Sequence, residues 1–313
     1  MVAAAGVVLV IGVSAPVSAA RGRPPPVVGR WNLTVTGEDG STFPSWLEIT
    51  FDEEGKLGGR LCGRVGVAEP LARVEWKKNQ LTFVDVEKGS QGATVERMYK
   101  AKMAYGMLDG EVTAGDAPPW SFIGARPPKF PARGRVPWGK PVTLISKGLI
   151  GWRLRNSHKG SCWKEMAGEL SNQVPCVDIV SDGRYQDFKL RLEFKLQKGS
   201  STGVFLRGRY EVQLRDDAGE PPASTGTGAV HGLLAPIRNA AGGPDEWQSL
   251  DVTMIGRRIT TFINGTKVLD NQEIVGPTGG ALDSEEAIPG PIMLRGDQGA
   301  VAFRNVVVSP ALW

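Results

Sequence analysis

Four side chains that could act together in catalysis or substrate binding fall in the stretch from Asp187 to Leu214. In DFKLRLEFKL the hydrophobic residues alternate with charged ones, which predicts a half-buried strand that turns Glu193 away from the core. A second alternating run, YEVQL, turns Glu211 and Gln213 away from the core in the same way. If both hydrophobic faces line one core, we expect these three side chains and Arg207 to meet on one polar sheet face. Carboxylates can take a proton and a guanidinium can stabilise the negative charge that develops, so this face is the candidate site.

Short segments of this alternating kind run along the whole chain, and turn residues separate them. Between Trp31 and Phe122, segments such as WNLTVT, SWLEITF and QLTFVDV predict about seven or eight antiparallel strands in a small barrel or sandwich. Further on, Asn264-Gly265 is the preferred residue pair for a tight hairpin turn. Because long helical patterns are missing and the chain has 41 Gly and 22 Pro, we predict an all-β protein.

Composition also suggests how the 313 residues are divided. Residues 1–20 are hydrophobic over too short a stretch to span a bilayer, and Val17 and Ala19 stand at the positions that signal peptidases recognise. We therefore expect a secreted or periplasmic protein without membrane insertion after cleavage, although no Lys or Arg precedes the hydrophobic stretch. The expected parts are a signal peptide at 1–20, a small antiparallel β-domain at 28–126, a Pro-rich linker at 127–141 and a second β-domain at 142–313.

Charge and cysteine content narrow the class of protein. The net charge is +4, but Lys and Arg are scattered among acidic residues, which argues against nucleic acid as a partner. In an exported protein Cys162 and Cys176 could form a disulfide across a hairpin, and the alternative is that Cys62 and these two are free buried thiols. Three cysteines and two histidines at these spacings do not make a zinc site.

A series of segments in the second β-domain, taken in their order along the chain, resembles the pattern of a known family. They are GLIGW, DIVSDGRYQDFKLRLEFKL, STGVFLRGRYEVQL, TGAVHGLLAP, EWQSLDVTMIGRRITTFINGTKVLDNQEI, GPTGGALD and GPIMLRGDQGAVAFRNVVV. With them, the run from about Leu144 to Val308 resembles the 3-keto-disaccharide hydrolase domain family. The resemblance implies a concanavalin A-like jelly-roll sandwich and a small carbohydrate substrate, a glycoside oxidised at C3.

The resemblance implies a particular way to break a glycosidic bond. A ketone at C3 acidifies the proton on C2, so a base can remove it, an enolate forms, the oxygen on C1 departs, and water then adds back. On this hypothesis Glu193 or Glu211 is the base, Arg207 stabilises the enolate, and Gln213 orients sugar hydroxyls. The structural alternative is that Glu193 is a solvated strand residue and that Arg207 only pairs with Glu211.

Other candidates lie in loops and at strand ends. His231, in the Gly-rich TGAVHGL loop, is expected to be a general acid, a sugar contact or a hydrogen-bonded structural residue. Trp247 could stack on a sugar ring or pack at the rim, Asp251 is a second-tier acid, and Asp297 is either a substrate contact or a turn cap. Where relatives commonly have GDHG, this chain has Gln298, which can bind a hydroxyl but cannot exchange a proton near neutral pH.

Two rival functions remain open from the sequence. Classical glycosidase chemistry would use the same pair of carboxylates, Glu193 and Glu211, flanking the bond. A non-catalytic carbohydrate-binding module on the same sandwich is the other reading, and the missing imidazole at Gln298 favours it. No cofactor is evident, and a divalent cation is conceivable only because several acids might converge, since no metal-loop pattern is present.

Overall fold

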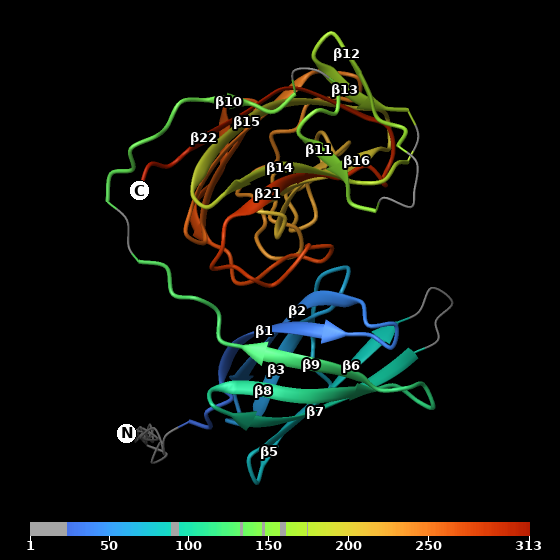
Figure 1. Ribbon diagram of the computed structural model, residues 1–313, viewed down its shortest axis with the longest axis vertical. Helices are drawn as coiled ribbons and strands as arrows, with labels where there is room; N and C mark the ends of the chain where they lie inside the picture. The colour runs from blue at the N-terminus through green and yellow to red at the C-terminus, as the bar shows by residue number, and fades with distance from the viewer. Residues whose placement is uncertain (1–23, 89–93, 132–133, 146–147, 157–160, 174) are drawn as a thin grey trace, which may run out of the picture.

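The computed structural model is built from strands (Figure 1). It describes residues 24–88, 94–131, 134–145, 148–156, 161–173 and 175–313, so the predicted signal peptide lies outside the described residues. All the secondary-structure elements in these ranges are β-strands, which confirms the predicted all-β class. Within the same ranges, no helix has the length and hydrophobicity that a membrane span requires.

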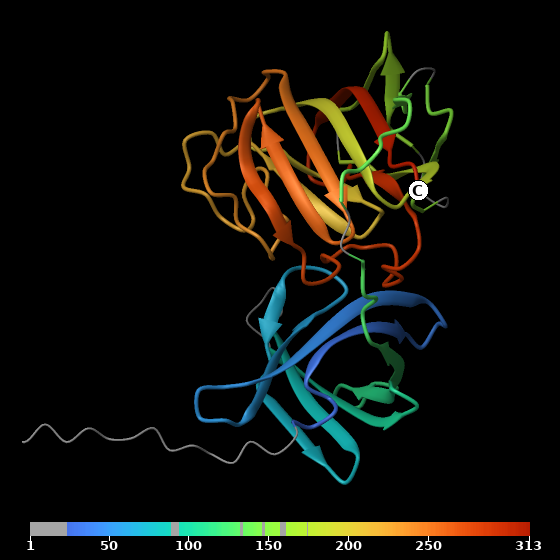
Figure 2. The ribbon, with the colours of Figure 1, turned by 90° about the vertical axis from the view of Figure 1, so that its left-hand side faces the viewer.

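The first half of the chain forms one curled antiparallel sheet of nine strands (Figure 2). β9 lies in its middle, β1 pairs with β9 on one side and with β2 on the other, and β4 and β5 are the end strands. Trp31, Leu33 and Phe83 fill the inside of the curl and are fully buried. The strands are β1 (Gly29–Thr36), β2 (Thr42–Phe51), β3 (Leu57–Cys62), β4 (Ala68–Pro70), β5 (Arg73–Lys77), β6 (Gln80–Lys88), β7 (Thr94–Ala104), β8 (Met107–Thr113) and β9 (Trp120–Ala125).

The second half is a jelly-roll sandwich of two sheets. The larger sheet has eight strands, namely β10 (Val142–Thr143), β12 (Lys164–Met166), β13 (Glu169–Asn172), β15 (Phe188–Leu196), β18 (Gln248–Ile255), β19 (Arg258–Ile263), β20 (Thr266–Glu273) and β22 (Val301–Pro310). The smaller sheet has five strands, in the order β11 (Trp152–Leu154), β14 (Ile179–Tyr185), β21 (Gly290–Leu294), β16 (Ser201–Leu206) and β17 (Tyr210–Arg215).

Alternation in the sequence accounts for the core between these sheets. Leu190, Leu192 and Phe194 point inward from β15, and Val212 and Leu214 point inward from β17, all with at most 1% exposure. The turn between β19 and β20 forms at Asn264 and Gly265, both with positive φ, as the preferred turn pair predicts. Cys162 and Cys176 form a disulfide, which leaves Cys62 as a buried free thiol.

A buried charge cluster joins the two domains. The Glu286 side chain, fully buried in the loop between β20 and β21, accepts hydrogen bonds at Oε2 from Arg30 and Asn32 of β1. Its Oε1 accepts a hydrogen bond from Tyr210 Oη at 2.6 Å. Because the carboxylate is shared between a strand of each domain, it fixes their relative position.

Loop contacts extend this junction toward the end of β3. Trp46 Nε1 donates to Pro277 O at 2.8 Å, and Gly280 N donates to Arg64 O at 3.0 Å. The backbone of Gly279 lies against Gly66, so closely that a Cβ on Gly279 would overlap it. The segment 277–286 therefore packs between the domains, where Figure 1 shows it in orange.

Candidate functional site

The two predicted carboxylates lie on opposite outer faces of the sandwich. Glu193 is on β15 in the eight-stranded sheet, and Glu211 is on β17 in the five-stranded sheet. Both strands do turn their hydrophobic faces to one core, but they do so from opposite sides of it, so their polar faces point apart. The expectation that Glu193 and Glu211 share one polar face is therefore wrong.

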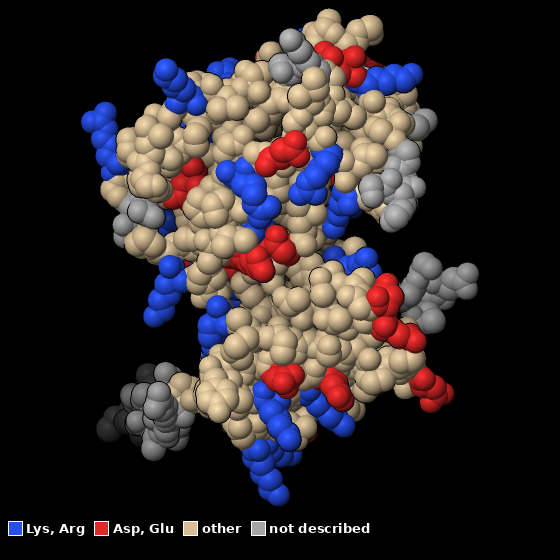
Figure 3. Space-filling model, viewed as in Figure 1, with Lys and Arg blue, Asp and Glu red and all other residues tan. Residues whose placement is uncertain are grey.

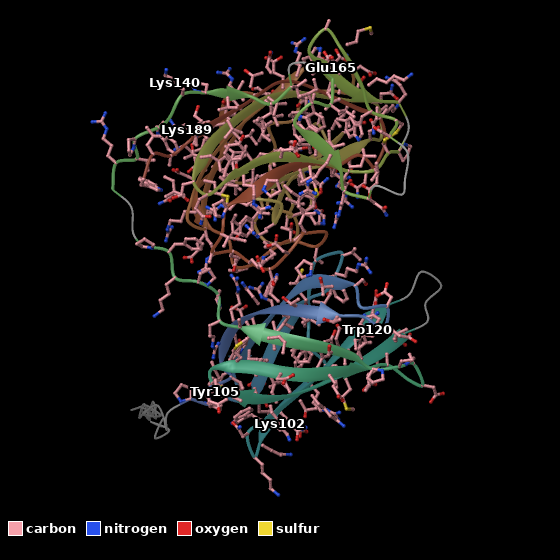
Figure 4. The ribbon with its side chains drawn as sticks, viewed as in Figure 1. Lys102, Tyr105, Trp120, Lys140, Glu165 and Lys189 are labelled. Carbon is pink, nitrogen blue, oxygen red and sulfur yellow. A yellow bond between two sulfur atoms is a disulfide. The ribbon has the colours of Figure 1, made fainter. Side chains whose placement is uncertain are left out.

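Glu193 belongs to a charged surface on the larger sheet. Its carboxylate accepts hydrogen bonds from Arg304 Nε at 2.6 Å and Asn305 Nδ2 at 3.1 Å, and the bond from Arg304 lowers its pKa. On this surface Arg304 lies over the ring of Trp247 at 4.0 Å, and Asp251 pairs with a neighbouring arginine of β15. In Figure 4 Lys189, an outward residue of the same strand, lies on the side of the sandwich away from the first domain. Three sequence candidates, Glu193, Trp247 and Asp251, thus lie outside the site described below.

Arg207 does not reach a polar sheet face either. It is the first residue of the turn between β16 and β17, with a φ of 56°, and its side chain is fully buried. Its Nη2 donates to Asp187 Oδ1 at 3.0 Å and to Gly256 O at 2.6 Å, and the ring of Phe130 lies 5.6 Å from its guanidinium carbon. Burial lowers its pKa. Its position under this turn corrects the expectation that it lies beside Glu211 on the sheet face.

The outer face of the five-stranded sheet carries a different set of residues. One row across it consists of Val180, Met293, Phe205 and Glu211, which are register partners on β14, β21, β16 and β17. Three of these are hydrophobic and pack together, so the acid is the only ionisable member of the row. The adjacent row includes Gly203, whose carbonyl accepts a hydrogen bond from the backbone N–H of Arg295.

The missing side chain at Gly203 lets Glu211 reach Arg295. A Cβ on Gly203 would lie 2.6 Å from Glu211 Cδ and would overlap the carboxylate, so the Glu211 side chain occupies the space over β16. From there its Oε1 accepts a hydrogen bond from Arg295 Nη1 at 2.9 Å. Arg295 Nε donates to Asp297 Oδ1 at 2.8 Å. Two carboxylates, one buried and one exposed, thus hold a single guanidinium.

Burial sets the protonation behaviour of this group. Glu211 is fully buried and its Oε2 has no hydrogen-bond partner within the described residues, so burial raises its pKa even though Arg295 opposes the shift. Burial would lower the pKa of Arg295, but Glu211 and Asp297 outweigh it and raise that pKa. With a side chain 22% exposed, Arg295 remains a permanent cation that opens to solvent.

A cleft of about 1160 Å³ lies over this face, between the sandwich and the first domain. Arg295 and Asp297 line it together with Arg155, whose Nη1 donates to Asp178 Oδ2 at 3.1 Å. Asp178 is held further by Gly296 N, which donates to its Oδ1. Figure 3 shows basic and acidic side chains side by side on the sandwich just above the junction of the domains. A cleft of this size with a few fixed polar groups suits a small polar ligand.

The remaining sequence candidates lie at different distances from this cleft. His231 follows β17, its backbone N–H donates to Glu211 O, and burial, with Arg295 as a second cause, lowers its pKa. Gln213 is buried and donates to Thr202 O at 3.1 Å, so it is not turned toward the cleft. The Gln298 side chain accepts a hydrogen bond from a serine hydroxyl of β16, and only Asp297 of the GDQG segment lines the cleft.

Sequence reasoning missed Arg155, Asp178 and Arg295. Arg295 had a usable signal, since it directly precedes the GDQG segment already singled out. Arg155 and Asp178 had none, because their pairing joins the end of β11 to the start of β14. No group of three or more His, Cys, Asp or Glu side chains within the described ranges is arranged to hold a metal ion.

Comparison with known proteins identifies the sandwich. Residues 141–309, more than half of the chain, match the model of the family described as the 3-keto-alpha-glucoside-1,2-lyase-like domain, which confirms the resemblance seen in the sequence. An acyl-homoserine lactone acylase QuiP from Pseudomonas syringae pv. tomato is 26% identical over 162 residues, which cover 51% of this chain and 19% of that protein. The chain therefore spans about a fifth of the length of this curated relative.

Solved structures also align with the chain over about half its length. Two putative glycosyl hydrolases from Parabacteroides distasonis are 19% and 24% identical, with TM-scores of 0.44 and 0.43, and cover 54% and 55% of this chain and 93% and 100% of their own. The carbohydrate-binding module CBM66 from Bacillus subtilis is 13% identical, with a TM-score of 0.36, and covers 51% of this chain and 95% of its own.

Proposed function

We propose that this chain, which belongs to the family of 3-keto-alpha-glucoside-1,2-lyase-like domains, is an exported enzyme that cleaves the glycosidic bond of 3-keto-glycosides. Membership of this family makes its sandwich a carbohydrate-active domain of glycosidase type. The proposed route is elimination: a base takes the proton from C2, the enolate forms on the C3 oxygen, the C1–O bond breaks, and water adds across C1 and C2. The bond between Cys162 and Cys176 supports export, since disulfides persist mainly in oxidising compartments.

The observation that carries this proposal is the fixed guanidinium of Arg295. An elimination of this kind needs a positive group at the oxygen where negative charge develops, already held in place before the reaction begins. Arg295 meets this need because Glu211 and Asp297 hold it from two sides while part of it opens to the cleft. Arg155, on the same cleft wall, supplies a second cation.

Asp297 is the proposed base. It lines the cleft, its side chain is 55% exposed, and it lies next to the group that would bind the enolate oxygen. The proton that it takes from C2 is then available to the departing oxygen. Glu211 is a positioning residue in this scheme, since it is fully buried and contacts Arg295 instead of the cleft. The opposite placement of Glu193 and Glu211 removes them as a pair flanking one bond.

The test is turnover of 3-keto-trehalose by the full chain and three variants. Asp297→Asn is expected to lower kcat by roughly 10²–10⁴-fold, the usual share of a general base. Arg295→Lys keeps the charge but loses the two-sided hold, and about a 10²-fold loss is expected. Glu193→Gln is the matched control on the other sheet and should stay within about 2-fold of wild type.

A second candidate function is carbohydrate binding without turnover. Gln298 favours it, because the family resemblance implies an imidazole at this position and glutamine cannot exchange a proton near neutral pH. The same experiment separates the two. If wild type binds the keto-sugar and releases no glucose, the catalytic proposal is refuted and the binding function is supported.

A further inference from the structure

A second hollow adjoins the cleft on the side of the first domain. It has a volume of about 570 Å³ and shares the lining residues Phe43 and Arg64 with the cleft, so the two are adjacent. The guanidinium of Arg64 lies over the Phe43 ring, 5.5 Å from its centre, and forms the boundary between the two hollows. A ligand in the cleft therefore lies next to the second hollow.

The lining of the second hollow combines aromatic rings with carboxylates. The rings of Phe43 and Trp120 meet edge to face with centres 5.9 Å apart, and both side chains are only partly buried. Asp39, at the tip of the turn between β1 and β2, lines the same hollow. Its Oδ1 accepts a hydrogen bond from Ser41 N, which fixes the turn. Sugars have hydrophobic ring faces and hydroxyl edges, and a hollow with aromatic walls and a few fixed polar groups suits them.

Hydrogen bonds join the first domain to the sandwich beside both hollows. Gly280 N donates to Arg64 O, and Trp46 of β2 donates to Pro277 O, so the strand and loop that carry Phe43 and Arg64 are bonded to the sandwich. The Glu286 cluster fixes β1, the partner of β2, to the same loop. These bonds hold the residues that line the two hollows beside each other, as two subsites of one site require.

We infer that the first domain supplies a second sugar subsite, in which Asp39, Phe43 and Trp120 bind the glycosyl unit that leaves from a 3-keto-glycoside. This inference rests on the proposed function, because the keto-sugar itself would lie in the cleft beside Arg295. It gives the first domain a part in substrate choice: glycosides whose leaving group is itself a sugar would be preferred to those with a small one.

The test compares two substrates of the full chain, 3-keto-trehalose and methyl 3-keto-glucoside. Asp39→Asn keeps the turn bond to Ser41, and Trp120→Leu keeps a hydrophobic residue, so both should fold. Each is expected to raise KM for the disaccharide about 10-fold and to leave KM for the methyl glycoside and kcat for both unchanged. Tyr105→Ala is the control: Tyr105 is a fully exposed aromatic at the opposite end of the same domain, as Figure 4 shows. Equal effects on both substrates, or none, would overturn the inference.

A binding experiment separates this inference from the proposed function. Isothermal titration of the wild-type chain with unoxidised trehalose requires no keto group and no turnover. Binding that Asp39→Asn or Trp120→Leu weakens about 10-fold supports the subsite even if no keto-glycoside is cleaved. If wild type shows no binding of trehalose at millimolar concentration and the two variants turn over the keto-disaccharide normally, the second subsite does not exist.

Discussion

Replacing Gly203 by alanine tests whether Glu211 is seated over β16 to hold Arg295. The added Cβ would overlap the Glu211 carboxylate, so the side chain must leave the space that it occupies. Because φ at Gly203 is not in the left-handed region, alanine fits the backbone, and the effect comes from the side-chain overlap alone. Separating a fully buried carboxylate from its charged partner costs about 3–5 kcal/mol, and we expect the free energy of unfolding to fall by that amount.

Gly203→Ala should also lower turnover, because Glu211 would no longer hold Arg295 in place. A guanidinium that has lost its buried partner no longer stands in place before the reaction, and loss of one such donor costs about 10²–10³-fold in kcat. Urea denaturation measures the first effect and release of glucose from 3-keto-trehalose measures the second. Gly58→Ala is the matched control, since Gly58 is also a strand glycine but has open space where the Cβ would be.

A double-mutant cycle distinguishes the specific overlap from general damage to the sheet. In a Glu211→Ala background the carboxylate is gone, so Gly203→Ala should cost less than about 1 kcal/mol. If the cost in that background is as large as in wild type, the side chain of Glu211 is not what the alanine displaces. Wild-type stability and turnover in Gly203→Ala alone would refute the described seating of Glu211 outright.

Three further predictions concern the junction, the imidazole and the disulfide. Glu286→Gln should lower the free energy of unfolding by about 3–5 kcal/mol, because it leaves a buried arginine without its counter-charge, and a change below about 1 kcal/mol in urea denaturation would contradict this. Burial lowers the pKa of His231 below 6.5, so between the lowered value and 6.5 the unfolded chain binds a proton that the folded chain does not. Stability should therefore fall as the pH drops below 6.5, and His231→Gln should reduce that slope in denaturation curves from about pH 7.5 to 5; an unchanged slope would show that another group causes it. Cys162→Ser opens a loop with a sequence separation of 14 and should cost about 3 kcal/mol, whereas equal melting of the variant and wild type would show that the bond does not constrain the chain.

The sequence predicts the strands and their inward faces well. Alternation in β15 and β17 identifies Leu190 and Val212 as core residues, and the Asn264–Gly265 pair places a hairpin turn, because both signals depend on neighbouring residues alone. The same alternation says nothing about which sheet a strand joins. Glu193 and Glu211 each turn outward as predicted, yet the two outward directions are opposite because the strands belong to different sheets.

The candidate site required contacts that no local pattern records. Arg207 looks like a sheet-face residue in FLRGRY, but its positive φ turns the chain so that the side chain enters the interior. Arg295 matters because Gly203 leaves room for Glu211, and these three residues come from three different strands or strand ends. Only Asp297 among the predicted residues lines the cleft.

The segment 277–286 borders the cleft at Leu282 and is bonded to the first domain at both of its ends, through Pro277 and Glu286. Swinging the domains apart would therefore break a buried charge cluster along with the rim of the cleft. These contacts hold the two walls of the cleft together, so the proposed keto-glycoside would enter a cleft of fixed width. Selection among glycosides would then depend on how well a sugar fits the shape of the cleft, without a domain closure that adjusts that shape.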